Sequence, residues 1–241
     1  MFRTAQIVLI AISLNSITAN AAEIFGIPRI VDGDTVQIGA LRIRLSGIDA
    51  PEPDQVCLTR QGDLWKCGVS SREELIKHSS GGGWRCQGTA KDRFGRLIAT
   101  CEVNGENIQA WMVRNGWALS FVRFSHLYDA DEATAREAGA GLWSGAFIAP
   151  WEWRNRNRKT AILGASTASE NAQQKLLAAV SAAGAQAPGC DIKGNVNRSG
   201  ECIYHPRGSR WYSQINMELN GKRWFCSAQE AEAAGCRLTK R

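Results

Sequence analysis

The sequence predicts a mainly β fold with inserted helices, and two observations lead to that expectation. Short runs of alternating apolar and polar residues recur between residues 24 and 147, and glycine-containing turns separate them. Stretches with the helical spacing of apolar residues lie between these runs. About five strands interrupted by helices are typical of a small closed barrel of the OB type, decorated by helices. Nearer the C-terminus the composition changes, and a small disulfide-stapled module is expected there.

Residues 1–21 have the pattern of a secretory signal peptide. Arg3 provides a basic start, Ile7 to Leu14 an apolar stretch, and Ala19-Asn20-Ala21 a small-residue cleavage site. The apolar stretch is short for a membrane span, although an uncleaved anchor is the alternative. We therefore expect a secreted or periplasmic monomer whose mature chain has no membrane span.

The first predicted element after the signal is a β-hairpin. Ile30 to Ile38 and Leu41 to Leu45 alternate in polarity, and Gly39-Ala40 separates them. Charged residues gather at its ends and on its second strand, and they are Asp32, Asp34, Arg44, Asp49 and Glu52. Carboxylates brought together repel one another unless a cation neutralises them. Oxygen ligands without convergent histidines or thiols favour calcium or magnesium.

The elements that follow are expected from residue periodicity and from glycines that end helices. After a loop at Pro53 to Gly68, further strands are expected at Trp84 to Thr89, Leu97 to Val103 and Trp117 to Phe124. The charged turn Ala90 to Arg96 joins the first two of these. Helices are expected at Val69 to Ser79, Glu106 to Asn115 and Asp129 to Gly139.

Eight cysteines in a chain with a secretory signal predict disulfides rather than metal thiolates. Four lie in the first part of the chain and four near its end, so each part is expected to close its own bridges. Three pairings are open in each part, and we favour Cys57 with Cys67 and Cys86 with Cys101. The spacing C-x-x-C is absent, which makes zinc a poor competitor.

Three motifs together resemble one known family. The stretch V31-D32-G33-D34-T35-V36, followed by R44-L45 and G47-I48-D49-A50-P51-E52, resembles the active-site signature of the staphylococcal nuclease family. The segment K91-D92-R93-F94-G95-R96 is similar to the family's second arginine motif. The stretch from Asn107 to Ala118 is similar to its helix leading into the last strand. The resemblance covers residues 24 to 147 and implies the same OB-type barrel.

The resemblance implies a calcium site and a phosphodiester-cleaving centre. Asp34 and Asp49 are the expected direct ligands of Ca²⁺, with the carbonyl of Ala50 as a third. The family has threonine where this chain has Ala50, but the backbone oxygen is the same. Asp32 is expected to orient the hairpin or a metal-bound water.

Three further residues would act on the substrate. Glu52 is placed to orient or deprotonate the attacking water. Arg44 and Arg96 carry planar, permanently charged forks that match phosphate oxygens. The implied activity is cleavage of DNA and RNA with little base specificity. The formal net charge of +6 is compatible with a polyanionic substrate.

The chain departs from the family pattern in its substrate-contacting aromatic residues. Phe94 stands where the family has a tyrosine, and its ring cannot donate a hydrogen bond to phosphate. The aromatic residue of the last strand is replaced by Val122 or shifted to Phe121 or Phe124. The alternative to an enzyme is a catalytically silent OB-type module that binds nucleic acid or protein.

The later part of the chain predicts three regions. Leu142-Trp143 and Pro150 to Trp153 form an apolar clasp that ends a nuclease-like domain at residues 22–153. We interpret the basic run Arg154 to Lys159 as a solvated boundary rather than a phosphate-tracking strip. Residues 154–188, rich in Ala, Ser, Gln and Gly, are expected to be a linker with one helix at Glu170 to Ala182.

Residues 189–241 are expected to form an accessory module. Strands are predicted at Cys202 to Pro206 and Arg223 to Cys226, and Ser227 to Glu230 is a capping box that opens a short helix. The module is similar to small domains with a Y-H-x-P…W-F-C-S pattern appended to bacterial nuclease-like proteins. Some of these bind zinc through a cysteine that Arg207 to Trp211 lacks. His205 is therefore expected to be a packed or exposed histidine rather than a ligand.

Overall fold

The computed structural model describes residues 22–155, 160–182, 189–196, 201–217, 222–233 and 236–240. The predicted signal peptide at residues 1–21 lies outside this range, as do residues 156–159 of the basic run. No helix in the described part of the chain is both long and apolar enough to cross a bilayer.

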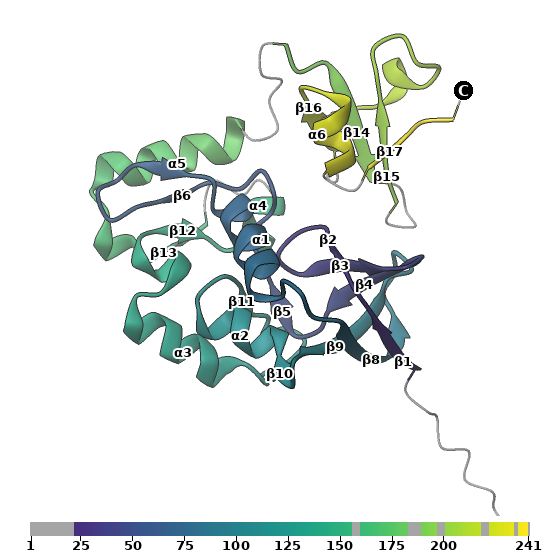
Figure 1. Ribbon diagram of the computed structural model, residues 1–241. Coiled ribbons are helices and arrows are strands. Elements are labelled where there is room, and N and C mark those ends of the chain that lie inside the picture. Colours follow the sequence, from purple (N-terminus) through teal and green to yellow (C-terminus); the bar gives the residue numbers. More distant parts are fainter. Residues whose placement is uncertain are drawn as a thin grey trace, which may run out of the picture.

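A curled sheet of seven strands forms the centre of the N-terminal part, and it gives the expected OB-like fold (Figure 1). Its strands are β1 (Ala22–Gly26), β2 (Arg29–Ile30), β3 (Thr35–Ile38), β4 (Leu41–Leu45), β8 (Trp84–Lys91), β9 (Leu97–Val103) and β10 (Glu106–Asn107). The order is β1-β8-β9-β4-β3-β2, and β10 pairs with β9. The β4–β9 pair is parallel and the other pairs are antiparallel. The sheet is thus larger than the five strands expected.

Two helices, α1 (Cys67–His78) and α2 (Ile108–Arg114), pack against this sheet. The inward face of β9 alternates as a half-buried strand should, because Ala99, Cys101 and Val103 are buried while the residues between them are more exposed. Leu75 of α1 and Met112 of α2 are fully buried in the same apolar cluster. The core therefore lies between the curled sheet and these helices.

The predicted first strand is interrupted. Residues 31–34 form a turn between β2 and β3, in which the N–H groups of Val31 and Asp32 both donate to the carbonyl of Thr35. The predicted strand Trp117 to Phe124 is also shorter, since only β11 (Leu119–Ser120) pairs with β5 (Ile48–Asp49). The first interruption places Asp32 and Asp34 in a turn rather than in a regular strand.

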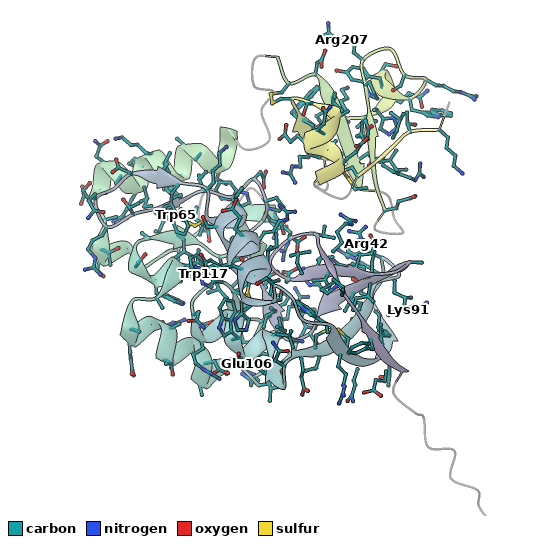
Figure 2. The ribbon with its side chains drawn as sticks, in the orientation of Figure 1. Arg42, Trp65, Lys91, Glu106, Trp117 and Arg207 are labelled. Carbon is teal, nitrogen blue, oxygen red and sulfur yellow. A yellow bond between two sulfur atoms is a disulfide. The ribbon has the colours of Figure 1, made fainter. Side chains whose placement is uncertain are left out.

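The loop expected at Pro53 to Gly68 contains a short hairpin of β6 (Cys57–Leu58) and β7 (Leu64–Trp65). Trp65 of β7 contacts Trp117 edge to face, with the ring centroids 6.5 Å apart (Figure 2). The helix α3 (Asp129–Ala138) lies where it was predicted and ends at Gly139, whose backbone is left-handed with φ 60°. A 3₁₀ turn at Gly141–Ser144 follows.

Both favoured disulfides of the first part are confirmed, Cys57–Cys67 and Cys86–Cys101. The second part closes its own bridges, Cys190–Cys226 and Cys202–Cys236. Cys86 and Cys101 are direct partners in the β8–β9 ladder, which explains that pairing. The division of the cysteines into two sets of four is therefore confirmed.

The expected linker is wrong for residues 162–182, which fold onto the nuclease-like part. Here β12 (Phe147–Ile148) pairs with β13 (Ile162–Leu163), and a 3₁₀ turn at Ala165–Thr167 leads into α5. The helix α5 (Glu170–Ala182) has the predicted bounds, but it is not a spacer. Its apolar face buries Leu176 and Val180 against Leu58 and Trp153. A composition rich in alanine resembles a linker even where every fourth residue is a core position.

The C-terminal module is a small sheet stapled by its two disulfides. Its four strands run in the order β16-β14-β15-β17, with bounds Lys222–Phe225, Ile192–Val196, Cys202–His205 and Arg237–Leu238. A 3₁₀ turn (Tyr212–Gln214) and α6 (Ala228–Ala233) complete it. The predicted capping box is present in a shifted form: the Ser227 hydroxyl accepts from Glu230 N, but the Glu230 carboxylate accepts from Cys226 N, one residue before the N-cap.

Replacing Leu176 by alanine tests whether α5 belongs to the folded domain. Leu176 is fully buried, so Leu176→Ala should lower the free energy of unfolding by about 2–5 kcal/mol. Gln174→Ala, an exposed site on the same helix, should change it by less than about 0.5 kcal/mol. Urea unfolding followed by tryptophan fluorescence measures both, and equal curves for the two variants would restore the linker interpretation.

Candidate active site

One arginine joins the two carboxylates that the sequence separates by fifteen residues. Arg44 of β4 stands opposite Thr35 of β3, and its guanidinium hydrogen-bonds to Asp34 Oδ1 and, at 2.7 Å, to Asp49 Oδ1. Asp34 comes from the turn before β3 and Asp49 from β5. Both carboxylates are buried, with residue exposures of 3% and 0%. The hairpin thus gathers its two acidic clusters as predicted.

The backbone fixes the Asp34 carboxylate from its other side. Ala50 N donates to Asp34 Oδ2 at 2.9 Å, and Asp34 N donates to Asp32 Oδ1 at 3.0 Å. Gly33 lies between the two acids, where an added Cβ would stand 2.3 Å from Ser71 Oγ and 2.6 Å from Ala50 Cβ. The glycine of the D-G-D motif is therefore required by the close approach of α1 and the Ala50 segment.

Burial and charge act on the site's pKa values in opposite directions. Burial alone would raise the pKa of Asp34, but the Arg44 guanidinium and the Ala50 N–H outweigh it and leave that pKa below its ordinary value. For Asp32, the Asp34 N–H and the Arg44 charge do not outweigh burial. Its pKa is raised to about 7, first by burial and then by the neighbouring charges of Asp34 and Glu52. Burial likewise raises the pKa of Glu52 despite a nearby arginine.

Arg96 lies one hydroxyl group away from the acidic cluster. Its Nη1 donates to Thr35 Oγ1 at 3.3 Å, and Thr35 Oγ1 donates to Asp34 Oδ1 at 3.0 Å. The rest of its guanidinium is held by Asp92, whose Oδ2 accepts from Arg96 Nε at 2.7 Å. Arg96 also lies over the Phe94 ring, 5.5 Å from its centroid. The aspartate of the K-D-R-F-G-R motif therefore orients the arginine that closes it.

A third arginine, which the sequence did not reveal, completes the cluster. Arg154 ends α4 (Pro150–Arg154), and its guanidinium makes a two-pronged contact with Asp49, Nη1 to Oδ1 at 2.9 Å and Nη2 to Oδ2 at 2.7 Å. Nη1 also donates to Glu52 Oε1 at 2.7 Å. The solvated-boundary interpretation is therefore wrong for Arg154, the first residue of the basic run.

The apolar clasp before Arg154 is the signal that could have found it. Trp153 is fully buried and its Nε1 donates to Asp54 Oδ1 at 3.2 Å, two residues past Glu52. Gln55, also buried, donates to the carbonyl of Ile148 at 2.7 Å. A helix anchored on the 52–55 segment must place its next side chain beside Glu52. The three tryptophans of the clasp, Trp143, Trp151 and Trp153, pack within apolar clusters, which is the structural role expected of them.

The oxygen donors of this site suit a hard divalent cation by chemistry. The predicted ligands are two carboxylates and the Ala50 carbonyl, and no group of three or more His, Cys, Asp or Glu side chains in the described residues is arranged to hold a metal. Every carboxylate oxygen of Asp34 and Asp49 already accepts a hydrogen bond. A cation at Asp49 would therefore take the place of the Arg154 guanidinium, which is 35% exposed and has room to move.

The aromatic positions near the site differ from the expected pattern. Phe121 stacks on Trp151 with centroids 5.5 Å apart, whereas Val122 and Phe124 are exposed by 51% and 73%. Phe94 stays beside the arginines, with Arg93 at 4.7 Å from its centroid. Phe121 is thus a packing residue, whereas the Phe124 ring is exposed and the Phe94 ring is half-buried.

Comparison with known proteins supports the same assignment as the geometry. Residues 42–145 match the family described as staphylococcal nuclease homologue. The succinoglycan biosynthesis protein ExoI of Rhizobium meliloti is 34% identical over 144 residues, which are 58% of this chain and 75% of that protein. An uncharacterized endonuclease of Escherichia coli O157:H7 is 31% identical over 144 residues, 56% of this chain and 88% of that protein.

A plant protein shares a shorter region. The staphylococcal-like nuclease CAN1 of Arabidopsis thaliana is 32% identical over 120 residues, which are 48% of this chain and 34% of that protein. The matched family region contains Arg44, Asp49, Glu52 and Arg96, and the bacterial matches span most of the relatives' length. The chain therefore belongs to the staphylococcal nuclease family.

Proposed function

We propose that this protein is a calcium-dependent phosphodiesterase that cleaves DNA and RNA with little base specificity. The observation that carries the proposal is the single guanidinium of Arg44 that holds Asp34 and Asp49 together, with Arg96 one hydroxyl away. The family is metal-dependent, and its nuclease members act on nucleic acids. The hard oxygen ligands favour calcium or magnesium, and the resemblance of the motifs to the family favours calcium.

Asp34, Asp49 and the carbonyl of Ala50 would hold the ion. A bound Ca²⁺ would supply a fixed positive charge beside the scissile phosphate. Arg44 and Arg96 would hold the non-bridging phosphate oxygens, because a guanidinium donates two parallel hydrogen bonds and stays charged at every working pH. No step in this scheme contacts a base edge, which is why we expect little base specificity.

Glu52 would orient or deprotonate the attacking water. Burial raises the pKa of Glu52, which makes its carboxylate a stronger base. Arg154 donates to one of its oxygens, Oε1, and so fixes the side chain. We propose that Arg154 neutralises Asp49 and Glu52 in the metal-free protein and yields Asp49 to the cation when it binds.

We also propose that the protein works in an oxidising compartment, either the periplasm or the exterior of the cell. The support is its four disulfides together with the signal-like N-terminal sequence. Cys57–Cys67 links β6 to the start of α1, directly after the segment that carries Glu52 and Asp54.

Cleavage of labelled DNA and RNA by the oxidised, signal-cleaved chain tests the proposed function. Cleavage should require Ca²⁺ and stop with chelator, and Glu52→Gln should lower turnover about a hundredfold or more with an unchanged thermal unfolding temperature. A well-folded wild-type chain that cleaves neither nucleic acid with any divalent cation would favour the silent binding module instead.

Two neighbouring arginines provide a matched test of phosphate binding. Arg96→Ala should lower kcat about a hundredfold, the usual loss when one transition-state donor is removed. Arg93→Ala removes the same charge three residues away, from an exposed side chain, and should change kcat less than about threefold. Steady-state kinetics on one oligonucleotide compares them, and equal losses would show that only net charge matters.

Arg154→Ala tests the counter-ion role without measuring activity. In chelator the variant should unfold at lower temperature, since Asp49 and Glu52 lose a partner; with Arg154 35% exposed, the loss should be smaller than the about 3–5 kcal/mol typical of fully buried pairs. Calcium binding, followed by calorimetry, should tighten. Arg114→Ala, which breaks an exposed pair with Asp131, is the control. Weaker calcium binding by Arg154→Ala would contradict the proposed displacement.

A further inference from the structure

The C-terminal module contains a cavity of about 430 Å³. This volume is within the range of small-ligand sites in proteins. Its walls come from β14, β15, β17 and the turn between β15 and β16, and they include Ile203, His205, Trp211, Ile215, Arg237 and Lys240. The active-site residues of the nuclease-like part do not contribute to it, so it is a separate site.

His205 is the polar group that marks the cavity as a binding site. The residue is 5% exposed, yet neither of its ring nitrogens has a hydrogen-bond partner among the described residues. Burial and the nearby Arg237 both lower its pKa, so the ring is neutral at physiological pH. A neutral imidazole offers one donor and one acceptor. Leaving a buried nitrogen unpaired is costly, and a polar atom of a ligand in the cavity would satisfy the His205 nitrogen that faces it.

The other walls supply an aromatic ring and apolar surface. Trp211 is 41% exposed, and Ile203 and Ile215 line the same space. Indole rings stack on planar heterocycles, and every nucleic-acid base offers such a face. A planar, partly apolar group with polar atoms on its edge therefore suits these walls.

The charge of the module favours an anion. Residues 189–241 hold nine Lys and Arg against five Asp and Glu, a net charge of +4 out of +6 for the whole chain. At the cavity, Lys240 is exposed, while Arg237 is paired with Glu201. A phosphate at the mouth of the cavity would gain the Lys240 ammonium without breaking that pair.

We propose that this cavity binds one unpaired nucleotide of a single-stranded nucleic acid. The base stacks on Trp211 between the two isoleucines, its edge meets one His205 nitrogen, and the adjoining phosphate contacts Lys240. The module would then hold a single strand independently of the chemistry at Glu52. The inference goes beyond the proposed nuclease activity, because binding at this cavity needs neither metal nor cleavage.

The test measures binding by the full signal-cleaved chain in chelator, where cleavage is absent. The probe is a fluorescein-labelled oligothymidylate of about 12 nucleotides, read by anisotropy at one fixed salt concentration. Trp211→Ala should weaken binding about 5- to 100-fold, the usual effect of losing one stacked base. Leu238→Ala removes an exposed apolar side chain outside the cavity and should leave binding unchanged.

Two further substitutions test the phosphate contact of Lys240 and the contact of His205 with the edge of the base. Lys240→Ala should weaken binding several-fold more than Arg207→Ala, because Arg207 is exposed elsewhere on the module and outside the cavity (Figure 2). His205→Phe keeps the ring packing but removes both nitrogens, and should also weaken binding. Thermal unfolding of each variant identifies any that fail to fold.

Three results would overturn the proposal. Equal affinities of Trp211→Ala and Leu238→Ala would exclude stacking, and equal effects of Lys240→Ala and Arg207→Ala would exclude a local phosphate contact. Displacement of the oligonucleotide by an acidic peptide as readily as by unlabelled oligothymidylate would show a general anion surface. If only the nuclease proposal fails, these affinities stay the same, because binding at the cavity needs neither metal nor cleavage. If only the binding proposal fails, cleavage is unaffected, because Trp211 lies outside the candidate active site.

Discussion

The buried contact between Arg44 and the two aspartates is the interaction on which the site depends. Asp34 and Asp49 are almost wholly removed from water, and two carboxylates in that position would repel each other and lose their hydration. The guanidinium bonds to both carboxylates, so it connects the β3–β4 hairpin to the β5 segment. The Ala50 N–H then fixes the second oxygen of Asp34. The geometry of the charged groups around Asp34 and Asp49 follows from this neutralisation.

Short sequence motifs were enough to predict much of the fold and the gathering of Asp34, Arg44 and Asp49. The D-G-D turn, Arg44 and Asp49 lie within one hairpin and its exit, so spacing alone places them together. The pairing of Cys86 with Cys101 could likewise be predicted, because neighbouring strands bring them opposite each other. Strand ends were less predictable: β11 stops after Ser120, where the Ser120 N–H donates to Glu132 of α3 instead of continuing a ladder.

Arg154 and α5 could not be predicted in the same way, since their partners are distant in the chain. Arg154 contacts carboxylates 102 and 105 residues earlier, and it opens a run of charges that looks solvated when viewed alone. The apolar face of α5 is made largely of alanine and two leucines, a pattern too weak to distinguish a docked helix from a spacer. In the folded structure, the apolar face of α5 packs against a cluster that includes Leu58 and Trp153.

The late position of Arg154 in the chain has a consequence for partial chains. Asp49 and Glu52 precede by 105 and 102 residues the guanidinium that pairs with them. Without α4, Glu52 loses the bond at Oε1, while Asp49 keeps its bond to Arg44. A truncated chain that lacks residues 150–154 therefore carries the charged motif without the completed cluster.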